Sequence, residues 1–404
     1  MEVKRAMRIG IYGGTFNPPH LGHLTSARAA LETLKLDRLL FIPDSLPPHK
    51  ELPPGSPRPE QRLEMTRLAA EQMNLGDCVE TLDLELRRAG RSYTADTLEE
   101  LHRRYPEAEF WLLMGADMFL SLHTWHAPEK ILSLAGIVAF GRTQEDMEAP
   151  FEVQRERLYR LCPSARIYTM SVPGVRSVSS TELRASLRAG GGSALLPPAV
   201  YGYILREGLY GTCADLRHLP PFQLRPTALS YLKHKRIPHV LGTEQEAVRL
   251  ALRYGGDVEK ARTAALLHDC TKKLELDGQL ALCARYQIPL DELERHALKL
   301  LHAKTGAYLA RDVFGVDDEI FTAILWHTTG HADMTLLEKI IYLADYIEPT
   351  RDFPGVDKLR QVCYDSLDAG LALGLSMTVQ EMRERGNPVH HATSEALEYL
   401  KGTE

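Results

Sequence analysis

The pattern of hydrophobic and polar positions divides the chain into two halves of different kinds. In the first half, short apolar runs of strand length alternate with segments whose apolar residues recur every three or four positions, which is helical periodicity. The expected strands are residues 7–12, 39–43, 79–86, 110–117 and 137–142, and helices are expected over residues 24–32 and 60–73 and from residue 92. This alternation predicts an α/β domain with a doubly wound parallel sheet.

Beyond about residue 215 the strand pattern stops, and helical segments follow one another. They are expected over residues 223–235, 241–254, 258–268, 276–286, 291–313, 317–327, 334–347, 358–385 and 394–401. The second half is therefore predicted to be all-α. We expect an α/β domain over residues 1–212, a short Pro-bearing linker over 213–224, and the helical domain over 225–404.

Composition narrows the class of protein. The net charge of −6 gives no general affinity for polyanions, so a nucleic-acid-binding role is not expected. No apolar run is long enough to span a bilayer, and the N-terminus leads into a strand without resembling a signal peptide. The six cysteines are scattered without a CxxC pair, which favours a reducing compartment. A cytoplasmic protein without membrane or nucleic-acid partners is expected.

The first candidate site is the turn that follows the first expected strand, Gly13–His23, with the sequence GGTFNPPHLGH. Gly13 and Gly14 let the backbone approach a ligand closely. His20 and His23 are three residues apart and share one face of the helix that starts there. Helix starts offer free N–H groups and a positive dipole end, so the turn is predicted to hold a polyphosphate.

The second candidate segment is another helix start, where Ser179, Ser180 and Thr181 precede Arg184. Ser179 and Glu182 have the spacing of a capping box, which explains the segment as a well-capped helix. Three hydroxyl groups and an arginine at a helix start also suit an anion. Both interpretations remain open on these residues alone.

Together the two segments resemble the HxGH and SSTxxR signatures of the Rossmann-like nucleotidyltransferase superfamily. The longer form of the first resembles bacterial nicotinate-mononucleotide adenylyltransferases. This resemblance implies transfer of adenylyl from ATP to nicotinate mononucleotide with Mg²⁺, and it implies His20, His23 and Arg184 as catalytic residues. It also implies ATP binding by Gly13, Gly14, Thr15, Phe16, His20, His23, Ser179, Ser180, Thr181 and Arg184.

Three further segments resemble the nicotinate branch of that superfamily: residues 47–50, 92–98, and 111–117 with Trp125-His126. The resemblance implies that the acceptor nucleotide is bound by Lys50, Thr94, Asp117 and Trp125. Nicotinamide mononucleotide or phosphopantetheine are alternative acceptors, against which the segments around Thr94 and Trp125 argue.

The helical half places hydrophilic metal-ligand side chains in apolar helices, where an unpaired one would cost several kcal/mol. Metal coordination would remove that cost. These residues are His239, His268, Asp269, His302, His327 and Asp345.

The order of these residues along the chain resembles that in the HD-domain phosphohydrolases. The sequence around them resembles that of the YqeK-type symmetrical bis(5′-nucleosyl)-tetraphosphatases. The resemblance implies a dinuclear centre bridged by Asp269, containing Fe²⁺/Fe³⁺, or Mn²⁺ or Zn²⁺. It implies hydrolysis of diadenosine tetraphosphate to two ADP, with Asp269 and Lys272 as catalytic residues. It also implies that Lys272 and Arg351 bind the phosphate groups of the substrate. The alternatives are another nucleotide phosphoester, a nucleotide sensor or a dimerisation module, and a homodimer is compatible with the sequence.

Overall fold

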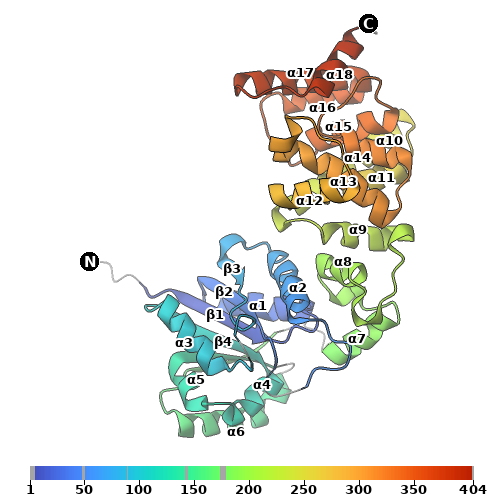
Figure 1. Ribbon diagram of the computed structural model, residues 1–404. Coiled ribbons are helices and arrows are strands. Elements are labelled where there is room, and N and C mark those ends of the chain that lie inside the picture. Colours follow the sequence, from blue (N-terminus) through green and yellow to red (C-terminus); the bar gives the residue numbers. More distant parts are fainter. Residues whose placement is uncertain (1–4, 48–50, 89, 142–143, 173–178, 403–404) are drawn as a thin grey trace. The chain divides into compact units, whose positions relative to one another are not determined.

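The computed structural model describes residues 5–47, 51–88, 90–141, 144–172 and 179–402. The chain divides into two compact units, Met1–Cys213 and Ala214–Glu404. Figure 1 shows a unit with a sheet and a unit built from helices.

The first unit contains a six-stranded parallel sheet with the strand order β3-β2-β1-β4-β5-β6. The strands are β1 (Arg8–Gly14), β2 (Arg38–Pro43), β3 (Val79–Thr81), β4 (Glu109–Gly115), β5 (Ala135–Gly141) and β6 (Ile167–Ser171). The order reverses between β1 and β4, so the loops after these two strands diverge. Open α/β sheets bind ligands at such a switch point, outside the carboxyl ends of the strands.

Helices cover both faces of this sheet, as the predicted doubly wound fold requires. They are α1 (Leu21–Thr33), α2 (Pro59–Glu71), α3 (Thr94–Arg104), α4 (Ala116–Ser121), α5 (Pro128–Leu134), α6 (Gln144–Leu161), α7 (Ser180–Arg188) and α8 (Pro198–Arg206). Alternation along β1 sends Ile9 and Ile11 into one core cluster with Leu98 of α3, and Tyr12 into the other with Ala27 of α1. Short 3₁₀ turns are η1 (Gly76–Cys78), η2 (Leu122–Thr124), η3 (Ser193–Leu195) and η4 (Leu209–Gly211).

The sequence pattern missed part of this unit. β6 was not predicted because it is an edge strand of half-buried and exposed residues, which gives no strong apolar run. β3 ends at Thr81 rather than near residue 86, because the chain then turns and the N–H groups of Leu86 and Arg87 bond to the carbonyl of Asp83. The helix expected from residue 92 begins at Thr94, after Tyr93.

In the described residues the second unit is helical. Its helices are α9 (Pro221–Leu229), α10 (Ile237–Tyr254), α11 (Val258–Leu267), α12 (Leu276–Tyr286), α13 (Leu298–Phe314), α14 (Asp318–Trp326), α15 (Leu336–Ile347), α16 (Val356–Asp365), α17 (Leu367–Glu384) and α18 (His391–Gly402). The 3₁₀ turns are η5 (Leu216–His218), η6 (His234–Arg236) and η7 (Glu294–His296). The segment expected as a linker, 213–224, thus contains η5 and the start of α9. None of the described helices combines the length and apolarity needed to cross a membrane.

The single helix predicted over residues 358–385 is wrong, because the chain breaks at Ser366. This residue is extended, with φ −153° and ψ 121°, and its hydroxyl accepts the N–H of Ala369 as the cap of α17. Gly370 then lets α17 fold back on α16, since a Cβ there would lie 2.7 Å from the sulfur of Cys363. Such a contact depends on tertiary packing, and helical periodicity continues through it unchanged.

Close packing against a glycine in the sheet yields a stability prediction. A Cβ at Gly136 of β5 would lie 2.6 Å from the ring of Trp111 on β4, closer than folded proteins tolerate. Gly136→Ala should therefore lower the stability of the first unit by roughly 1–3 kcal/mol. Gly115→Ala is the control, because a Cβ there meets nothing within 4 Å. Equal effects of both changes on thermal unfolding would contradict this packing account.

Candidate active sites

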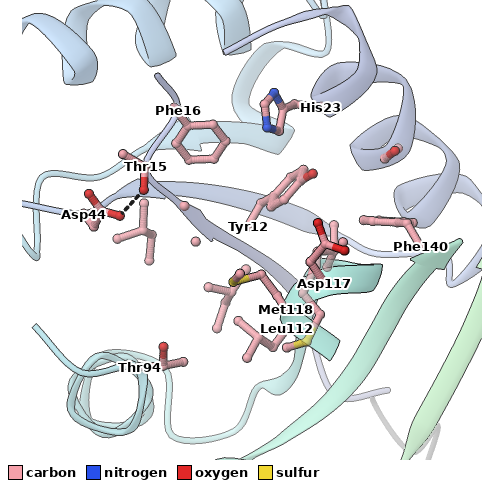
Figure 2. Close-up of a pocket in the computed structure, with 18 of the residues that line it drawn as sticks. Tyr12, Thr15, Phe16, His23, Asp44, Thr94, Leu112, Asp117, Met118 and Phe140 are labelled. Carbon is pink, nitrogen blue, oxygen red and sulfur yellow. Dashed lines mark hydrogen bonds between the residues drawn. The ribbon is translucent and has the colours of Figure 1, made fainter. Parts of the chain in front are cut away.

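A cavity of about 590 Å³ lies at the carboxyl ends of β1 and β4, at the switch point of the sheet (Figure 2). Most of the residues expected to bind nucleotides line it. They are Gly13, Gly14, Thr15, Phe16, His20, His23, Thr94, Asp117, Trp125, Ser179, Ser180 and Thr181. Lys50 lies outside the described residues.

The two histidines of the first motif lie at the start of α1 with their rings in contact, 3.7 Å between centroids and tilted by 36°. The backbone N–H of His20 donates to Nδ1 of His23 at 3.1 Å, so neutral His23 carries its proton on Nε2. Burial lowers the pKa of His20 to about 4. At neutral pH the unliganded His20 is therefore uncharged, and it can serve a phosphate as a hydrogen-bond donor rather than as a cation.

A buried arginine that the sequence analysis did not single out holds the glycine-rich turn. Arg62 of α2 has no exposed surface, and it donates to the carbonyl of Thr15 at 2.8 Å and to Asp44 at 3.0 Å. Asp44 in turn accepts the hydroxyl of Thr15 at 2.8 Å. In the sequence Arg62 looks like any cation of an amphipathic helix, and only Asp44, directly after an apolar strand, carried a usable signal.

The second motif forms the predicted capping box, and it also connects to the first motif. The hydroxyl of Ser179 accepts the N–H of Glu182 at 3.1 Å, which starts α7. Arg184 donates to the carbonyl of Asn17 at 2.9 Å and to the hydroxyl of Thr181 at 3.0 Å. The same helix start therefore contains the N-terminal cap and keeps hydroxyl groups and an arginine close together, so the two interpretations do not exclude each other.

The part of the cavity that Thr94 lines also contains a buried acid, Glu85, which is 8% exposed. Its carboxylate accepts the hydroxyl of Thr97 at 2.8 Å, and Arg88 donates to the same hydroxyl. Burial raises the pKa of Glu85 from 4.5 to about 7, with a further rise from the nearby charge of Asp44. A group that titrates near neutral pH inside a cavity is a candidate functional residue.

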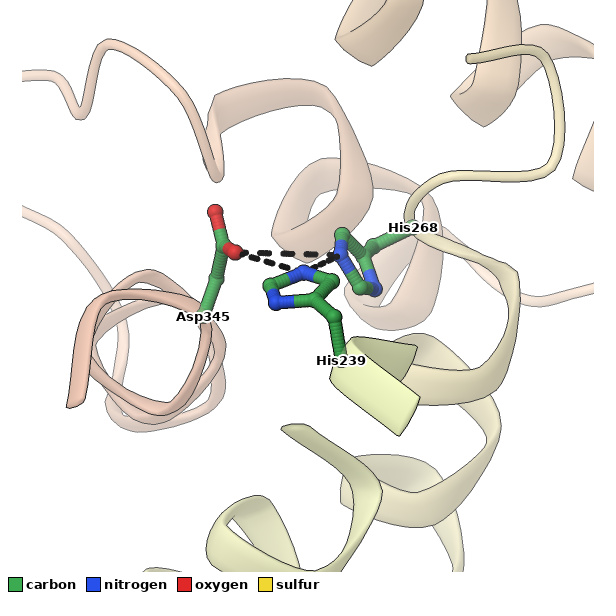
Figure 3. Close-up of side chains that lie close together, drawn as sticks. All are labelled: His239, His268 and Asp345. Atoms are coloured by element: carbon green, nitrogen blue, oxygen red, sulfur yellow. Dashed lines mark hydrogen bonds and ion pairs between the residues drawn. The ribbon is translucent and has the colours of Figure 1, made fainter. Parts of the chain in front are cut away.

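The second unit brings together all six expected metal-ligand residues. His239 of α10, His268 after α11 and Asp345 of α15 lie around one point (Figure 3). Nε2 of His239 is 3.0 Å from Oδ1 of Asp345 and 3.3 Å from Nε2 of His268. These distances match the separation of neighbouring ligands around one metal ion, given metal–ligand bonds of about 2.1 Å.

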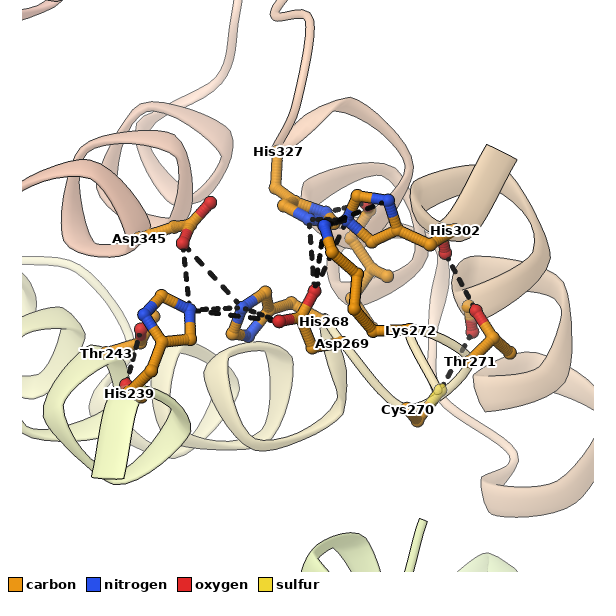
Figure 4. A network of polar contacts seen from close by, with 12 residues as sticks. His239, Thr243, His268, Asp269, Cys270, Thr271, Lys272, His302, His327 and Asp345 are labelled. Carbon is orange, nitrogen blue, oxygen red and sulfur yellow. Dashed lines mark hydrogen bonds and ion pairs between the residues drawn. The ribbon is translucent and has the colours of Figure 1, made fainter. Parts of the chain in front are cut away.

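A second cluster adjoins the first and shares Asp269 with it (Figure 4). Nε2 of His302 is 3.2 Å from Oδ1 of Asp269 and 3.1 Å from Nε2 of His327. The other oxygen of Asp269, Oδ2, faces the first cluster, 3.5 Å from Nε2 of His268. Asp269 thus lies between the two clusters with one oxygen toward each.

The donor set fits divalent metal ions. Nδ1 of His268 and of His327 bond to the carbonyls of Ala265 and Ile324 at 2.6 and 2.7 Å, which leaves their Nε2 lone pairs facing the cluster. Burial lowers the pKa of His302 and, further, of His327, so both are neutral. Burial would raise the pKa of Asp269, yet the imidazoles of His268 and His302 outweigh burial and hold it well below its usual range.

A buried carboxylate oxygen of Asp269 supports this fit, and three positively charged side chains surround the two clusters. Oδ1 of Asp269 is buried and has no hydrogen-bond partner among the residues that the structure describes. Lys272 reaches Nε2 of His302 at 2.7 Å, and Arg351 reaches Oδ1 of Asp345 at 2.6 Å. Arg236, which the sequence analysis did not identify, contacts Oδ2 of Asp269. These three side chains are 26–33% exposed, so they can reach a ligand at the surface of the site.

Comparison with known proteins agrees with this division. A Cytidylyltransferase-like family matches residues 11–186, and the HD domain family matches residues 236–350. A Desulfitobacterium hafniense (strain Y51) protein named "Probable nicotinate-nucleotide adenylyltransferase" is 37% identical over 204 residues, covering 50% of this chain and 95% of that protein. The "Bis(5′-nucleosyl)-tetraphosphatase, symmetrical" of Bacillus subtilis (strain 168) is 40% identical over 170 residues, covering 41% of this chain and 91% of that protein.

A solved structure from Clostridium acetobutylicum, described as a predicted HD superfamily hydrolase involved in NAD metabolism, is 40% identical in sequence. The alignment covers 46% of this chain and 99% of the solved chain, with a TM-score of 0.45. The fold, motifs and family matches thus define a nucleotidyltransferase-like α/β unit joined to an HD domain. The chain belongs to the nicotinate-nucleotide adenylyltransferase family through its first half and to the symmetrical bis(5′-nucleosyl)-tetraphosphatase family through its second.

The buried acid of the first cavity makes a pH prediction. Because the pKa of Glu85 is raised to about 7 in the folded protein, Glu85 stays protonated there up to about pH 7. In the unfolded chain it loses its proton above about pH 4.5. Stability should therefore fall as the pH rises through this interval, by roughly 3 kcal/mol in total, and Glu85→Gln should remove that slope. An NMR titration of the glutamate carboxyl carbons, assigned with Glu85→Gln, should give a midpoint near 7. A midpoint near 4.5 would contradict this environment.

Proposed function

We propose that the first unit transfers the adenylyl group of ATP to nicotinate mononucleotide, giving nicotinate adenine dinucleotide and pyrophosphate. The observation that carries this proposal is the cavity in which His20, His23 and the start of α7 face one another at the switch point of the sheet. The family relationship supports the choice of acceptor, and nicotinamide mononucleotide and phosphopantetheine remain the alternatives to be tested.

The reaction needs no general base, because the phosphate of the mononucleotide is already an anion when it attacks the α-phosphorus of ATP. Pyrophosphate leaves with the electron pair of the broken P–O bond. The chain's task is to align two polyanions and to stabilise charge at the transferring phosphorus. Neutral His20 and His23 would donate hydrogen bonds, the N–H groups at the start of α7 would bind phosphate oxygens, and Mg²⁺ would enter with ATP.

We propose that the second unit hydrolyses diadenosine tetraphosphate symmetrically to two ADP. Asp269 would bridge two metal ions, one held with His239, His268 and Asp345 and the other with His302 and His327. Bound divalent ions would supply an activated water molecule and neutralise phosphate charge. Lys272, Arg351 and Arg236 are positioned to balance the charge of the polyphosphate as it binds. Of the candidate ions, Fe²⁺/Fe³⁺, Mn²⁺ and Zn²⁺ all suit this nitrogen and oxygen donor set.

A paired assay on the full-length chain tests both proposals. His23→Ala should lower dinucleotide synthesis by on the order of 10²-fold, because a donor to the transition state is lost, and should leave hydrolysis unchanged. Asp269→Ala should abolish hydrolysis of diadenosine tetraphosphate with Fe²⁺ or Mn²⁺, because both metal ions lose their shared ligand, and should leave synthesis unchanged.

The controls are histidines outside both sites. His102→Ala is the control for the first unit, because the ring of His102 packs on Phe110 and does not line the cavity. His296→Ala is the control for the second unit, because the side chain of His296 is 76% exposed. Hydrolysis that survives Asp269→Ala would contradict cleavage at a centre bridged by Asp269. If no metal ion supports cleavage of diadenosine tetraphosphate, the second unit is a sensor, a dimerisation module or an enzyme for another phosphoester. Synthesis that survives His23→Ala would contradict the first proposal.

A further inference from the structure

A buried glutamate that binds no proposed metal lies directly behind one of the ligand histidines. Glu348 follows α15 with its side chain completely buried. Its Oε1 lies 3.0 Å from Nδ1 of His239. The N–H and the hydroxyl of Thr350 each donate to the same carboxylate at 2.6 Å. These contacts fix the carboxylate on the side of His239 that faces away from the cluster.

Two features of neighbouring elements make room for Glu348 and hold its backbone. Gly242 lies one helical turn after His239 on α10, and a Cβ there would come within 2.5 Å of Oε2 of Glu348. The guanidinium of Arg360 donates to the carbonyls of Ile347, Glu348 and Arg351 at 2.8–3.0 Å. The place of Glu348 behind His239 is thus determined from three separate segments of the chain.

Among the residues that the structure describes, no carboxylate lies behind the other histidines of the centre in this way. Nδ1 of His268 and Nδ1 of His327 each bond to a backbone carbonyl. The ring of His302 contacts Nζ of Lys272, which also lies 3.8 Å from Oδ1 of Asp269. The two metal positions therefore differ. The position formed by His239, His268, Asp269 and Asp345 has two carboxylate ligands and a carboxylate behind one imidazole. The position formed by Asp269, His302 and His327 has one carboxylate ligand. Cations adjoin both positions, since Arg236 and Arg351 contact the carboxylates of the first and Lys272 lies at the second.

We propose that Glu348 is a positioning residue that directs Nε2 of His239 toward the first metal position, and that this makes the first position bind metal more tightly than the second. The inference rests on the metal centre proposed above. A carboxylate that accepts the Nδ1–H of an imidazole fixes its tautomer and increases the basicity of Nε2, and loss of such a partner typically weakens metal binding by about 10–100-fold. Arg236 and Arg351 balance only part of the negative charge of Asp269, Asp345 and Glu348 at the first position, whereas Lys272 balances the single carboxylate of the second.

The test is a titration of the metal-free, full-length chain with Co²⁺, followed by calorimetry and by the visible absorption of bound Co²⁺. The unmodified chain should bind two ions in two steps of unequal affinity. Glu348→Gln should weaken the tighter step by about 10–100-fold, change its absorption spectrum, and leave the weaker step in place. Gly242→Ala should act in the same direction while keeping the carboxylate, because the new methyl group displaces Glu348 from His239.

A matched control is available on the same helix. Glu338 of α15 is buried, accepts the N–H of Thr335 at 2.7 Å, and lies 3.1 Å from Nε2 of His331, which is not one of the proposed ligands. Glu338→Gln should therefore lower stability without changing either Co²⁺ step. If Glu348→Gln loses its helical circular-dichroism signal, Gly242→Ala decides the question.

The outcomes separate this inference from the proposal beneath it. Two unequal steps in the unmodified chain that persist unchanged in both Glu348→Gln and Gly242→Ala would overturn the role of Glu348 and leave the metal centre standing. Two equal steps would overturn the difference between the positions. A chain that binds no Co²⁺ at all would contradict the metal centre itself.

Discussion

A completely buried carboxylate, that of Asp269, lies between two groups of imidazoles, and the second unit is organised around it. Burying such a charge without partners would be prohibitive, so helices α10, α11, α13, α14 and α15 each bring a polar side chain to it or to its neighbours. Carbonyls and Glu348 bond to the outer nitrogens of three of these imidazoles and turn the inner ones toward the cluster. The surrounding apolar packing holds these ligands in place.

The first unit handles charge differently. Arg62, which is fully buried, bonds to the protein itself: through Thr15 and Asp44 it holds the turn that carries Gly13 and Gly14. Within the described part of the cavity, the groups left for phosphate are mostly neutral donors, namely imidazoles and helix starts. One chain thus contains a cavity lined largely by neutral hydrogen-bond donors and a second site whose donor set suits metal ions.

The sequence predicted the α/β and all-α division, the six residues that converge in the second unit and most of those that line the first cavity, because these depend on local periodicity and on polar residues interrupting apolar segments. It did not predict β6, whose edge position removes the apolar signal, or the break at Ser366, which depends on Gly370 packing against Cys363. Arg62, Arg236 and Glu348 were missed for a related reason. In sequence each is an ordinary charged residue, and only the fold reveals what it contacts.

We propose that Asp269 joins two metal positions into one centre. The most direct measurement is the electron paramagnetic resonance spectrum of the full-length chain loaded with Mn²⁺. The account predicts two bound ions with an exchange-coupled spectrum, and it predicts that Asp269→Asn removes the coupling or one of the ions. Two magnetically isolated ions in the unmodified chain, or a single bound ion at saturation, would contradict it.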